Sequence, residues 1–410
     1  MNIKRVNQKV QKWIDKDDDT SSLDLNGLTS AEGLKLPGNF KGTLLLDGLT
    51  NAVGLKLPET IEGGLHLDGL TSAVGLTLPT SVGWNLSLNG LTSAVGLTLP
   101  ETIKGELFLQ GLTSAVGLTL PENYKRDLFL NSLTSAMGLT LPTEVRSLSL
   151  DSLTSAMGLK LPTCVRGNLR LNGLTNAVGL KLPETIEGGL HLDGLTSAEG
   201  LTLPTSVQGL YLNGLTSAEG LKLPDVIGGH LCLNGLTSAE GLTLPETIER
   251  DLNLDGLTSA VGLTLPTCVR GNLYLNGLTS AVGLKLPTSV GGWLRLNGLT
   301  SAVGLTLPSV GGGNLYLNGL TSAVGLTLPE SVGGGYLYLN GLTSAEGLTL
   351  PKKVGNLYLE GLSSAEGLTL PESVGGGIYF RSLPESDKKA LSNKGTITVL
   401  SLSSIKLNVF

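Results

Sequence analysis

The sequence predicts an all-β chain, a right-handed parallel β-solenoid with coils of about 21 residues. Residues 50 to 73 read TNAVGLKLPETIEGGLHLDGLTSA, and residues 175 to 198 repeat the same 24 letters. An L-x-L pair returns every 21 residues or so, first at Leu23, Leu44 and Leu65. A fixed period in the twenties is typical of a solenoid, in which each unit buries its apolar face only by stacking on its neighbours. Seventeen clear units follow, plus a decayed one at Ile378.

A single repeat, residues 65 to 85, predicts how one coil folds. Alternation of leucine with polar residues favours two short strands, residues 65 to 67 and residues 76 to 78. Gly69 and Gly75 allow turns, and Pro79 is expected to end the second strand. The side chains that we expect to point inward are Leu65, Leu67, Leu70, Ala73, Leu76, Leu78 and Val82.

A solenoid leaves strand edges open at both ends, and we expect a cap at each. Residues 1–22 are predicted to form an amphipathic cap helix, with an apolar face formed by Ile3, Val6, Val10, Trp13 and Ile14. Its basic face leaves a membrane-surface helix as an alternative. The repeat solenoid spans 23–380. In the C-terminal cap, 381–410, a helix N-capped by Ser386 is followed by two alternating strands, GTITVLSL and SSIKLNVF.

Composition argues against several classes of function. A net charge of −6, with 15% charged residues, lacks the basic field of a nucleic-acid-binding protein. The three cysteines lie several coils apart and are expected to be reduced thiols. The N-terminus lacks the apolar run of a signal peptide, and no run of about 18 apolar residues predicts a membrane span. We therefore expect a cytoplasmic protein without a cofactor, with secretion by a signal-less route left open.

The run L-P-x-x-I/V-x-G-x-L-x-L-x-G-L-T resembles the short bacterial class of leucine-rich repeats over about residues 23 to 380. The resemblance implies a bacterial protein that binds a partner rather than an enzyme. Two departures from the family pattern stand out. Leu70, Leu91 and Leu112 occupy the place of the family's ladder asparagine, and the Asn or Asp comes two places earlier, as at Asp68 and Asn89.

The most variable position of the repeat is the outward residue of the first strand, which we call the first-strand column. Six of the eight tyrosines of the chain lie in it. Tyrosine and arginine supply large contact area at low entropic cost, so this column predicts a binding strip. The structural alternative is that exposed strand positions simply favour aromatic residues. The candidate binding residues are Phe108, Phe129, Tyr211, Tyr274, Arg295, Tyr316, Tyr338, Tyr358 and Tyr379.

Two further columns have structural and functional interpretations. The column from Asn26 and Asp47 to Asn340 is almost all Asn or Asp, and we expect its side chains to bond the corner backbone. A calcium ladder is the alternative. Threonines such as Thr77 and Thr98 recur on the opposite face, which is compatible with β-propensity or with an ice-binding array.

The sequence predicts neither an enzyme nor a metal site. Catalysis needs different residue types that converge on one point, whereas copied repeats supply the same types everywhere. His66 and His191 lie six coils apart and cannot share a metal. His230 and Cys232 share a strand face, but no orienting acid is evident in the sequence near them.

We therefore expect a non-catalytic scaffold that binds another macromolecule, with protein as the favoured partner, along the first-strand column. Two alternatives stay open. The first is a carbohydrate-binding or adhesin-like surface protein, because tyrosine rings stack on sugar faces. The second is a purely structural rod, for which changing the tyrosines would have no effect on binding.

Overall fold

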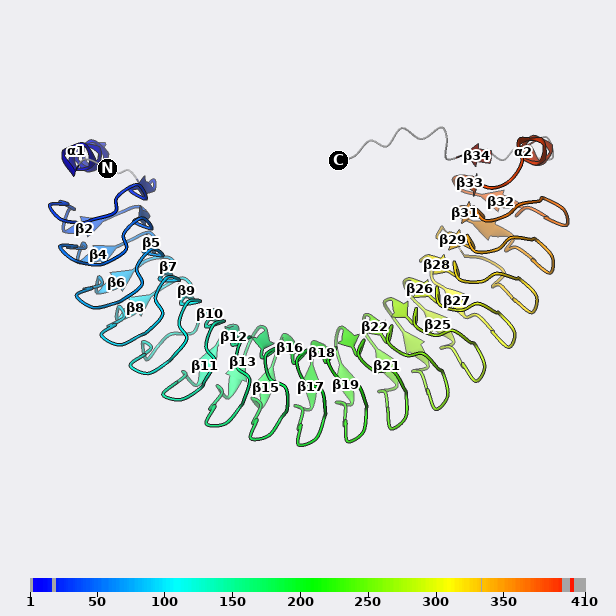
Figure 1. Ribbon diagram of the computed structural model, residues 1–410, viewed down its shortest axis with the longest axis horizontal. Helices are drawn as coiled ribbons and strands as arrows, with labels where there is room; N and C mark the ends of the chain where they lie inside the picture. The colour runs from blue at the N-terminus through cyan, green and yellow to red at the C-terminus, as the bar shows by residue number, and fades with distance from the viewer. Residues whose placement is uncertain (1–2, 17–19, 333, 393–398, 402–410) are drawn as a thin grey trace. The chain divides into compact units, whose positions relative to one another are not determined.

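The computed structural model describes the chain except residues 1–2, 17–19, 333, 393–398 and 402–410 (Figure 1). It confirms a parallel β-solenoid. The chain divides into two compact units. Unit 1 comprises Met1–Leu195 and Gly200–Pro204, and unit 2 comprises Thr196–Glu199 and Thr205–Phe410.

Each coil contributes one short strand to a parallel sheet on the face that carries the first-strand column. In unit 1 these strands are β1 (Leu23–Asp24), β3 (Leu44–Leu45), β5 (Leu65–His66), β7 (Leu86–Ser87), β9 (Leu107–Phe108), β10 (Leu128–Phe129), β12 (Leu148–Ser149), β14 (Leu169–Arg170) and β16 (Gly189–His191). In unit 2 they are β18 (Gly209–Tyr211), β20 (Leu231–Cys232), β22 (Leu252–Asn253), β24 (Leu273–Tyr274), β26 (Leu294–Arg295), β28 (Leu315–Tyr316), β29 (Tyr336–Tyr338), β31 (Asn356–Tyr358), β33 (Ile378–Phe380) and β34 (Val399–Ser401).

The register of this sheet places equivalent residues of successive repeats side by side. Leu44 pairs with Leu65, which pairs with Leu86. The two leucines of each L-x-L pair are almost fully buried, as Leu65 and Leu67 show with 0% exposure. Because equivalent side chains lie on top of one another, the core is a set of leucine columns that run from coil to coil.

A second set of short strands covers another face of the coils. These are β2 (Asn39–Phe40), β4 (Thr60–Ile61), β6 (Ser81–Val82) and β8 (Thr102–Ile103), then β11 (Glu144–Val145), β13 (Cys164–Val165) and β15 (Thr185–Ile186) in unit 1. In unit 2 they are β17 (Ser206–Val207), β19 (Val226–Ile227), β21 (Thr247–Ile248), β23 (Cys268–Val269), β25 (Ser289–Val290), β27 (Ser309–Val310), β30 (Lys353–Val354) and β32 (Ser373–Val374).

The predicted second strand at residues 76 to 78 was therefore wrong. The backbone N–H of Leu76 donates to the carbonyl of Ala73 at 3.0 Å, within its own coil, so it is not available to a ladder between coils. The strand forms instead at Ser81–Val82, beyond Pro79, where backbone groups pair with the neighbouring coils. Leu78 is half-buried rather than a core residue, and Pro79 is buried in its place.

Helix α1 (Ile3–Ile14) covers the first coils, as the apolar spacing predicts. Val6 and Val10 are buried, and Trp13 stacks on Phe40 with ring centroids 4.1 Å apart. The Asn7 side chain donates to the carbonyl of Gly33 at 2.8 Å and accepts from the N–H of Lys35 at 3.0 Å. In the described part of the chain, no helix is long and apolar enough to cross a membrane.

The C-terminal helix, α2 (Glu385–Ser392), is also present, but Ser386 does not cap it. The helix begins two residues earlier than a cap at Ser386 predicts. Pro384 directly precedes it, and the Pro384 carbonyl accepts bonds from the N–H groups of Asp387 and Lys388. The carboxylate of Asp387 accepts from the N–H of Ala365 at 3.0 Å and so joins the helix to a preceding coil. Of the two predicted strands, the first contains β34, which pairs with β33, and the second lies outside the described residues.

Tyr124 breaks the regularity of the second set of strands. It occupies the column of Ile103 and Val145 and is 2% exposed. Its hydroxyl donates to the carbonyl of Asp127 and accepts from the N–H of Leu107 at 2.8 Å. Burial raises the pKa of this hydroxyl. No strand of this set lies between β8 and β11 in the described chain, so the buried phenol, with its own hydrogen bonds, takes the place of strand pairing here.

Replacement of Tyr124 with phenylalanine is expected to lower the free energy of unfolding by about 1–3 kcal/mol, because two buried backbone groups lose a partner. Below the unfolded-state pKa of about 10 the contribution of the hydroxyl is complete. As the pH rises above that value, the unfolded chain releases a proton that the folded chain keeps, so the contribution is lost. Urea unfolding of both proteins from about pH 8 to pH 11 checks this. If the free energies of unfolding of the two proteins changed with pH by the same amount, the fold would not be holding the phenol of Tyr124 protonated.

Candidate functional site

The first-strand column forms a row of half-exposed side chains from Tyr211 to Tyr379 in unit 2, whereas in unit 1 the buried Ser87 and Ser149 interrupt it. The strand register pairs Phe108 with Phe129 in unit 1, and Tyr274 with Arg295 and Arg295 with Tyr316 in unit 2. On either side of each outward residue, apolar side chains, which are leucines except for Ile378 and Phe380 around Tyr379, point into the core. The outward direction that the sequence predicts for this column is therefore present in the fold.

Four tyrosines of unit 2 form a stacked row that we call the tyrosine ladder: Tyr316, Tyr338, Tyr358 and Tyr379. Successive ring centroids lie 4.5, 4.3 and 4.4 Å apart, with interplanar angles of 5°, 12° and 6°. Because each ring covers the face of the next, the ring edges and hydroxyl groups remain for a ligand to contact.

The packing of the ladder also affects its hydroxyl groups. Burial raises the pKa of Tyr338, and the charges of Tyr358 and Tyr316 on either side raise it further. Burial likewise raises the pKa of Tyr358, as does the neighbouring Tyr379. Tyr338 and Tyr358 therefore present neutral phenols, which donate and accept hydrogen bonds, at ordinary pH.

Arg295 lies at the N-terminal end of the ladder, between aromatic rings. Its guanidinium carbon is 5.2 Å from the ring centroid of Tyr274 and 4.8 Å from that of Tyr316. A third ring, that of Trp293, lies 5.1 Å away. The Nε atom of Arg295 is buried and has no hydrogen-bond partner among the described residues. This geometry holds the cation by cation–π attraction.

Trp293 and Tyr336 are two further aromatic residues of this surface, and neither is among the residues predicted from the sequence. Each precedes a first-strand column residue by two positions, so strand alternation turns it to the same face. The ring centroids of Trp293 and Tyr316 lie 6.2 Å apart, and those of Tyr336 and Tyr338 lie 6.3 Å apart, each pair in an edge-to-face arrangement. The two-residue alternation of side chains along a β-strand is the sequence signal that identifies both residues. We call the resulting set the aromatic cluster: Tyr274, Trp293, Arg295, Tyr316, Tyr336, Tyr338, Tyr358 and Tyr379.

The remaining predicted strip residues do not join this cluster. Phe108 and Phe129 form a separate stacked pair in unit 1, with centroids 5.1 Å apart and an angle of 3°. Tyr211 lies at the start of unit 2, and the column positions that separate it from Tyr274 are Cys232 and Asn253. Six of the nine predicted residues therefore gather in one place.

The Asn/Asp column forms bonds between coils, and the prediction that its side chains bond their own corner was wrong. The N–H of Asp47 donates to Asn26 Oδ1 at 2.8 Å, that of Asp68 to Asp47 Oδ1 at 2.9 Å, and that of Asn89 to Asp68 Oδ1 at 2.8 Å. The same bond links Asn276 to Asn297 in unit 2. A ladder between coils therefore exists two positions before the place where the leucine-rich-repeat family has its asparagine. It engages one side-chain oxygen of each of these residues, whereas Oδ1 of Asn131, another member of the column, is buried and has no hydrogen-bond partner among the described residues.

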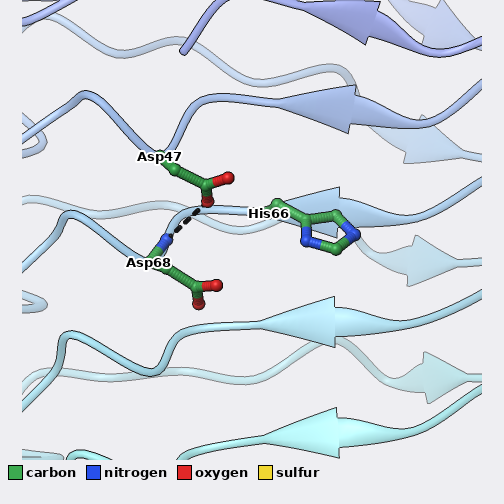
Figure 2. Close-up of side chains that lie close together, drawn as sticks. All are labelled: Asp47, His66 and Asp68. Atoms are coloured by element: carbon green, nitrogen blue, oxygen red, sulfur yellow. Dashed lines mark hydrogen bonds between the residues drawn. The ribbon is translucent and has the colours of Figure 1, made fainter. Parts of the chain in front are cut away.

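Figure 2 shows one place on this face where three metal-ligating side chains meet: Asp47, His66 and Asp68. One ligand atom from each residue can be chosen so that all three lie within 4.8 Å of one another. All three side chains are half-buried. Asp47 belongs to the coil before His66, so a comparison of His66 with His191 alone does not reveal this group.

The second unit contains a related but different arrangement around His230. Its Nδ1 atom lies 3.2 Å from Asp251 Oδ2, so an acid does lie beside this histidine, contrary to the sequence-based interpretation. Asp251 comes from the next coil, 21 residues later, which is why it is not evident near His230 in the sequence. That the chain is not an enzyme stays a prediction.

No family model, curated protein or solved structure matches this chain.

Proposed function

We propose that this chain is a non-catalytic repeat scaffold that binds a protein partner through the aromatic cluster. The observation that carries the proposal is the uninterrupted stack from Arg295 through the tyrosine ladder. Aromatic and arginine side chains held rigid before binding lose little entropy when a partner docks, and such residues dominate the binding energy of protein interfaces.

The stacking favours protein over carbohydrate as the ligand. A sugar ring docks on the open face of an aromatic ring, but within the ladder both faces of Tyr338 and Tyr358 are covered by other tyrosines. What remains is a row of ring edges and phenol hydroxyls, flanked by Asn314 and by the guanidinium of Arg295. Apolar side chains, backbone carbonyls and carboxylates of a protein partner suit such a surface.

The likeness of the repeat to short bacterial leucine-rich repeats supports the same class of function. We propose on this ground that the chain is a bacterial leucine-rich-repeat-like scaffold. The ladder of Asn and Asp between coils adds support, because it joins successive coils as the family's asparagine does.

Replacement of Tyr274, Tyr316, Tyr338 and Tyr358 with serine is expected to abolish partner capture while the fold persists. These side chains point outward, so the core is unaffected. The fold loses stacking, worth about 0.5–1.5 kcal/mol per pair, the cation–π contacts of Arg295 with Tyr274 and Tyr316, and the hydrogen bond from Asn314 to Tyr316. A parallel variant with phenylalanine at the same positions keeps the stack and removes the hydroxyls. Pull-down from lysates and a glycan panel, both with the folded proteins, measure the effect. If the serine variant loses binding and the phenylalanine variant binds more weakly than the wild type, the partner contacts both the ring edges and the hydroxyl groups.

A matched control lies on another surface of the same unit. Val261, Val282, Val303 and Val324 are 72%, 70%, 60% and 54% exposed, and their replacement with serine should leave binding unchanged. Identical capture by the wild type and both tyrosine variants would contradict the proposal and favour a structural rod. Capture of glycans that depends on the tyrosines would instead favour carbohydrate binding.

A further inference from the structure

The side chains of Asp47, His66 and Asp68 meet on the face of unit 1 that carries the first-strand column (Figure 2). His66 belongs to β5. Asp68 follows two residues later, and Asp47 occupies the equivalent place in the preceding coil. The stack therefore brings Asp47 next to His66 although 19 residues separate them. One ligand atom from each residue lies within 4.8 Å of the other two, and a metal ion bound at about 2.0–2.2 Å from nitrogen and oxygen ligands would draw the three atoms together.

Backbone groups hold both carboxylates in place. Asp47 Oδ1 accepts from the N–H of Asp68 at 2.9 Å. Asp68 Oδ1 accepts from the N–H of Asn89 at 2.8 Å and from the Ser87 hydroxyl at 2.6 Å. These bonds all use Oδ1, so the Oδ2 atom of each carboxylate is left to accept a cation.

The two carboxylates also lack a protein cation. Asp151, at the same position of a later coil, pairs with Arg170 at 3.1 Å, and Asp127 pairs with Arg146 at 3.4 Å. Within the described ranges, neither Asp47 nor Asp68 forms an ion pair with lysine or arginine. Two neighbouring carboxylates therefore stand beside an imidazole with their charge unneutralised by the chain.

We propose that Asp47, His66 and Asp68 bind one divalent transition-metal ion of the zinc class. An imidazole nitrogen favours such ions over Mg²⁺ and Ca²⁺, which prefer all-oxygen sites. Three protein ligands leave at least one coordination position for water or for a group from another molecule. This site lies in unit 1 and is independent of the aromatic cluster in unit 2.

The copied repeat provides an internal comparison. Residues 175 to 198 reproduce residues 50 to 73 letter for letter, so His191 and Asp193 repeat His66 and Asp68. The coil before the copy differs, because Asn172 replaces Asp47 and Arg170 replaces Leu45. The second site therefore has one carboxylate fewer and a guanidinium next to it, and burial together with Arg170 lowers the pKa of His191. Both differences disfavour a bound cation.

Isothermal titration of the full chain with ZnCl₂ is expected to show one site. The variants Asp47→Asn and His66→Asn should each weaken zinc binding by about tenfold or more. Asp47→Asn introduces the residue that the copied repeat has at the equivalent position, Asn172. The Asp47→Asn variant should fold, because Asn172 Oδ1 makes the equivalent bond to the N–H of Asp193 at 3.1 Å. The reciprocal double variant Arg170→Leu, Asn172→Asp should gain a second site of similar affinity.

The three cysteines are replaced with serine in every protein of this titration, so that thiols do not bind zinc. Circular dichroism establishes that each variant is folded. Three results would overturn the proposal: no zinc binding by the parent chain, binding that survives His66→Asn undiminished, or an unchanged stoichiometry in the reciprocal variant. Zinc should also raise the unfolding midpoint of the parent chain and not that of His66→Asn, a readout that needs no heat signal.

Discussion

Gly90→Ala is expected to destabilise unit 1 by more than about 3 kcal/mol, a large effect for the addition of one methyl group. A Cβ atom at this position would lie 2.1 Å from the carbonyl oxygen of Asp68 and 2.7 Å from that of Leu70. Both oxygens belong to the backbone of the preceding coil, which the Asn/Asp ladder holds in place. The coils would have to separate locally. Urea unfolding followed by far-UV circular dichroism measures the loss.

Gly96 lies in the same repeat and provides the matched control. Its φ is +80°, but nothing lies within 4 Å of an added Cβ. Gly96→Ala therefore carries only the strain of a left-handed backbone, about 1–2 kcal/mol. If the two substitutions had equal effects, the close approach between coils at Gly90 would not be what makes that glycine necessary.

Val10→Asp is expected to displace helix α1 and to make the chain aggregate. Val10 is 1% exposed, and a carboxylate there would be buried without a partner, at a cost of more than about 3 kcal/mol. Loss of the helix exposes Phe40, which Trp13 covers, and opens the first coil for pairing with other chains. Analytical ultracentrifugation and urea unfolding measure the outcome.

Gln8→Asp introduces the same charge at an exposed position of the same helix. It is expected to leave both the stability and the sedimentation of the chain unchanged. A monomeric, fully stable Val10→Asp protein would mean that α1 is not needed to protect the first coil.

The columns of the solenoid could be predicted because each repeat is a copy with a fixed period. Leu65, Leu67 and Leu70 are buried as the alternation indicates, and the first-strand column points outward from Phe108 to Tyr379. The apolar spacing of Val6 and Val10 likewise predicted the cap helix. These features depend on local patterns that recur in every coil, so the sequence carries them in full.

Other features depended on where backbone groups find their partners. The N–H of Leu76 bonds to Ala73 in its own coil, so the second strand forms at Ser81–Val82. Alternation pointed to residues 76 to 78, which carry two leucines, and not to Ser81–Val82, which has one apolar residue, so the pattern by itself selected the wrong segment. For the same reason the Asn/Asp column was assigned to its own corner, whereas its acceptors serve the next coil.

The amino-acid sequence by itself determined the solenoid, its caps and the outward column with its tyrosines, since periodicity and burial follow from the order of residues. Only the tertiary structure decided which side chains meet across coils. It placed Asp47 beside His66 and Asp251 beside His230, and it stacked the rings from Tyr316 to Tyr379 face to face. Stacking turns a separation of about 20 residues into direct contact, and the coil-to-coil distances that determine such contacts exist only in the folded chain.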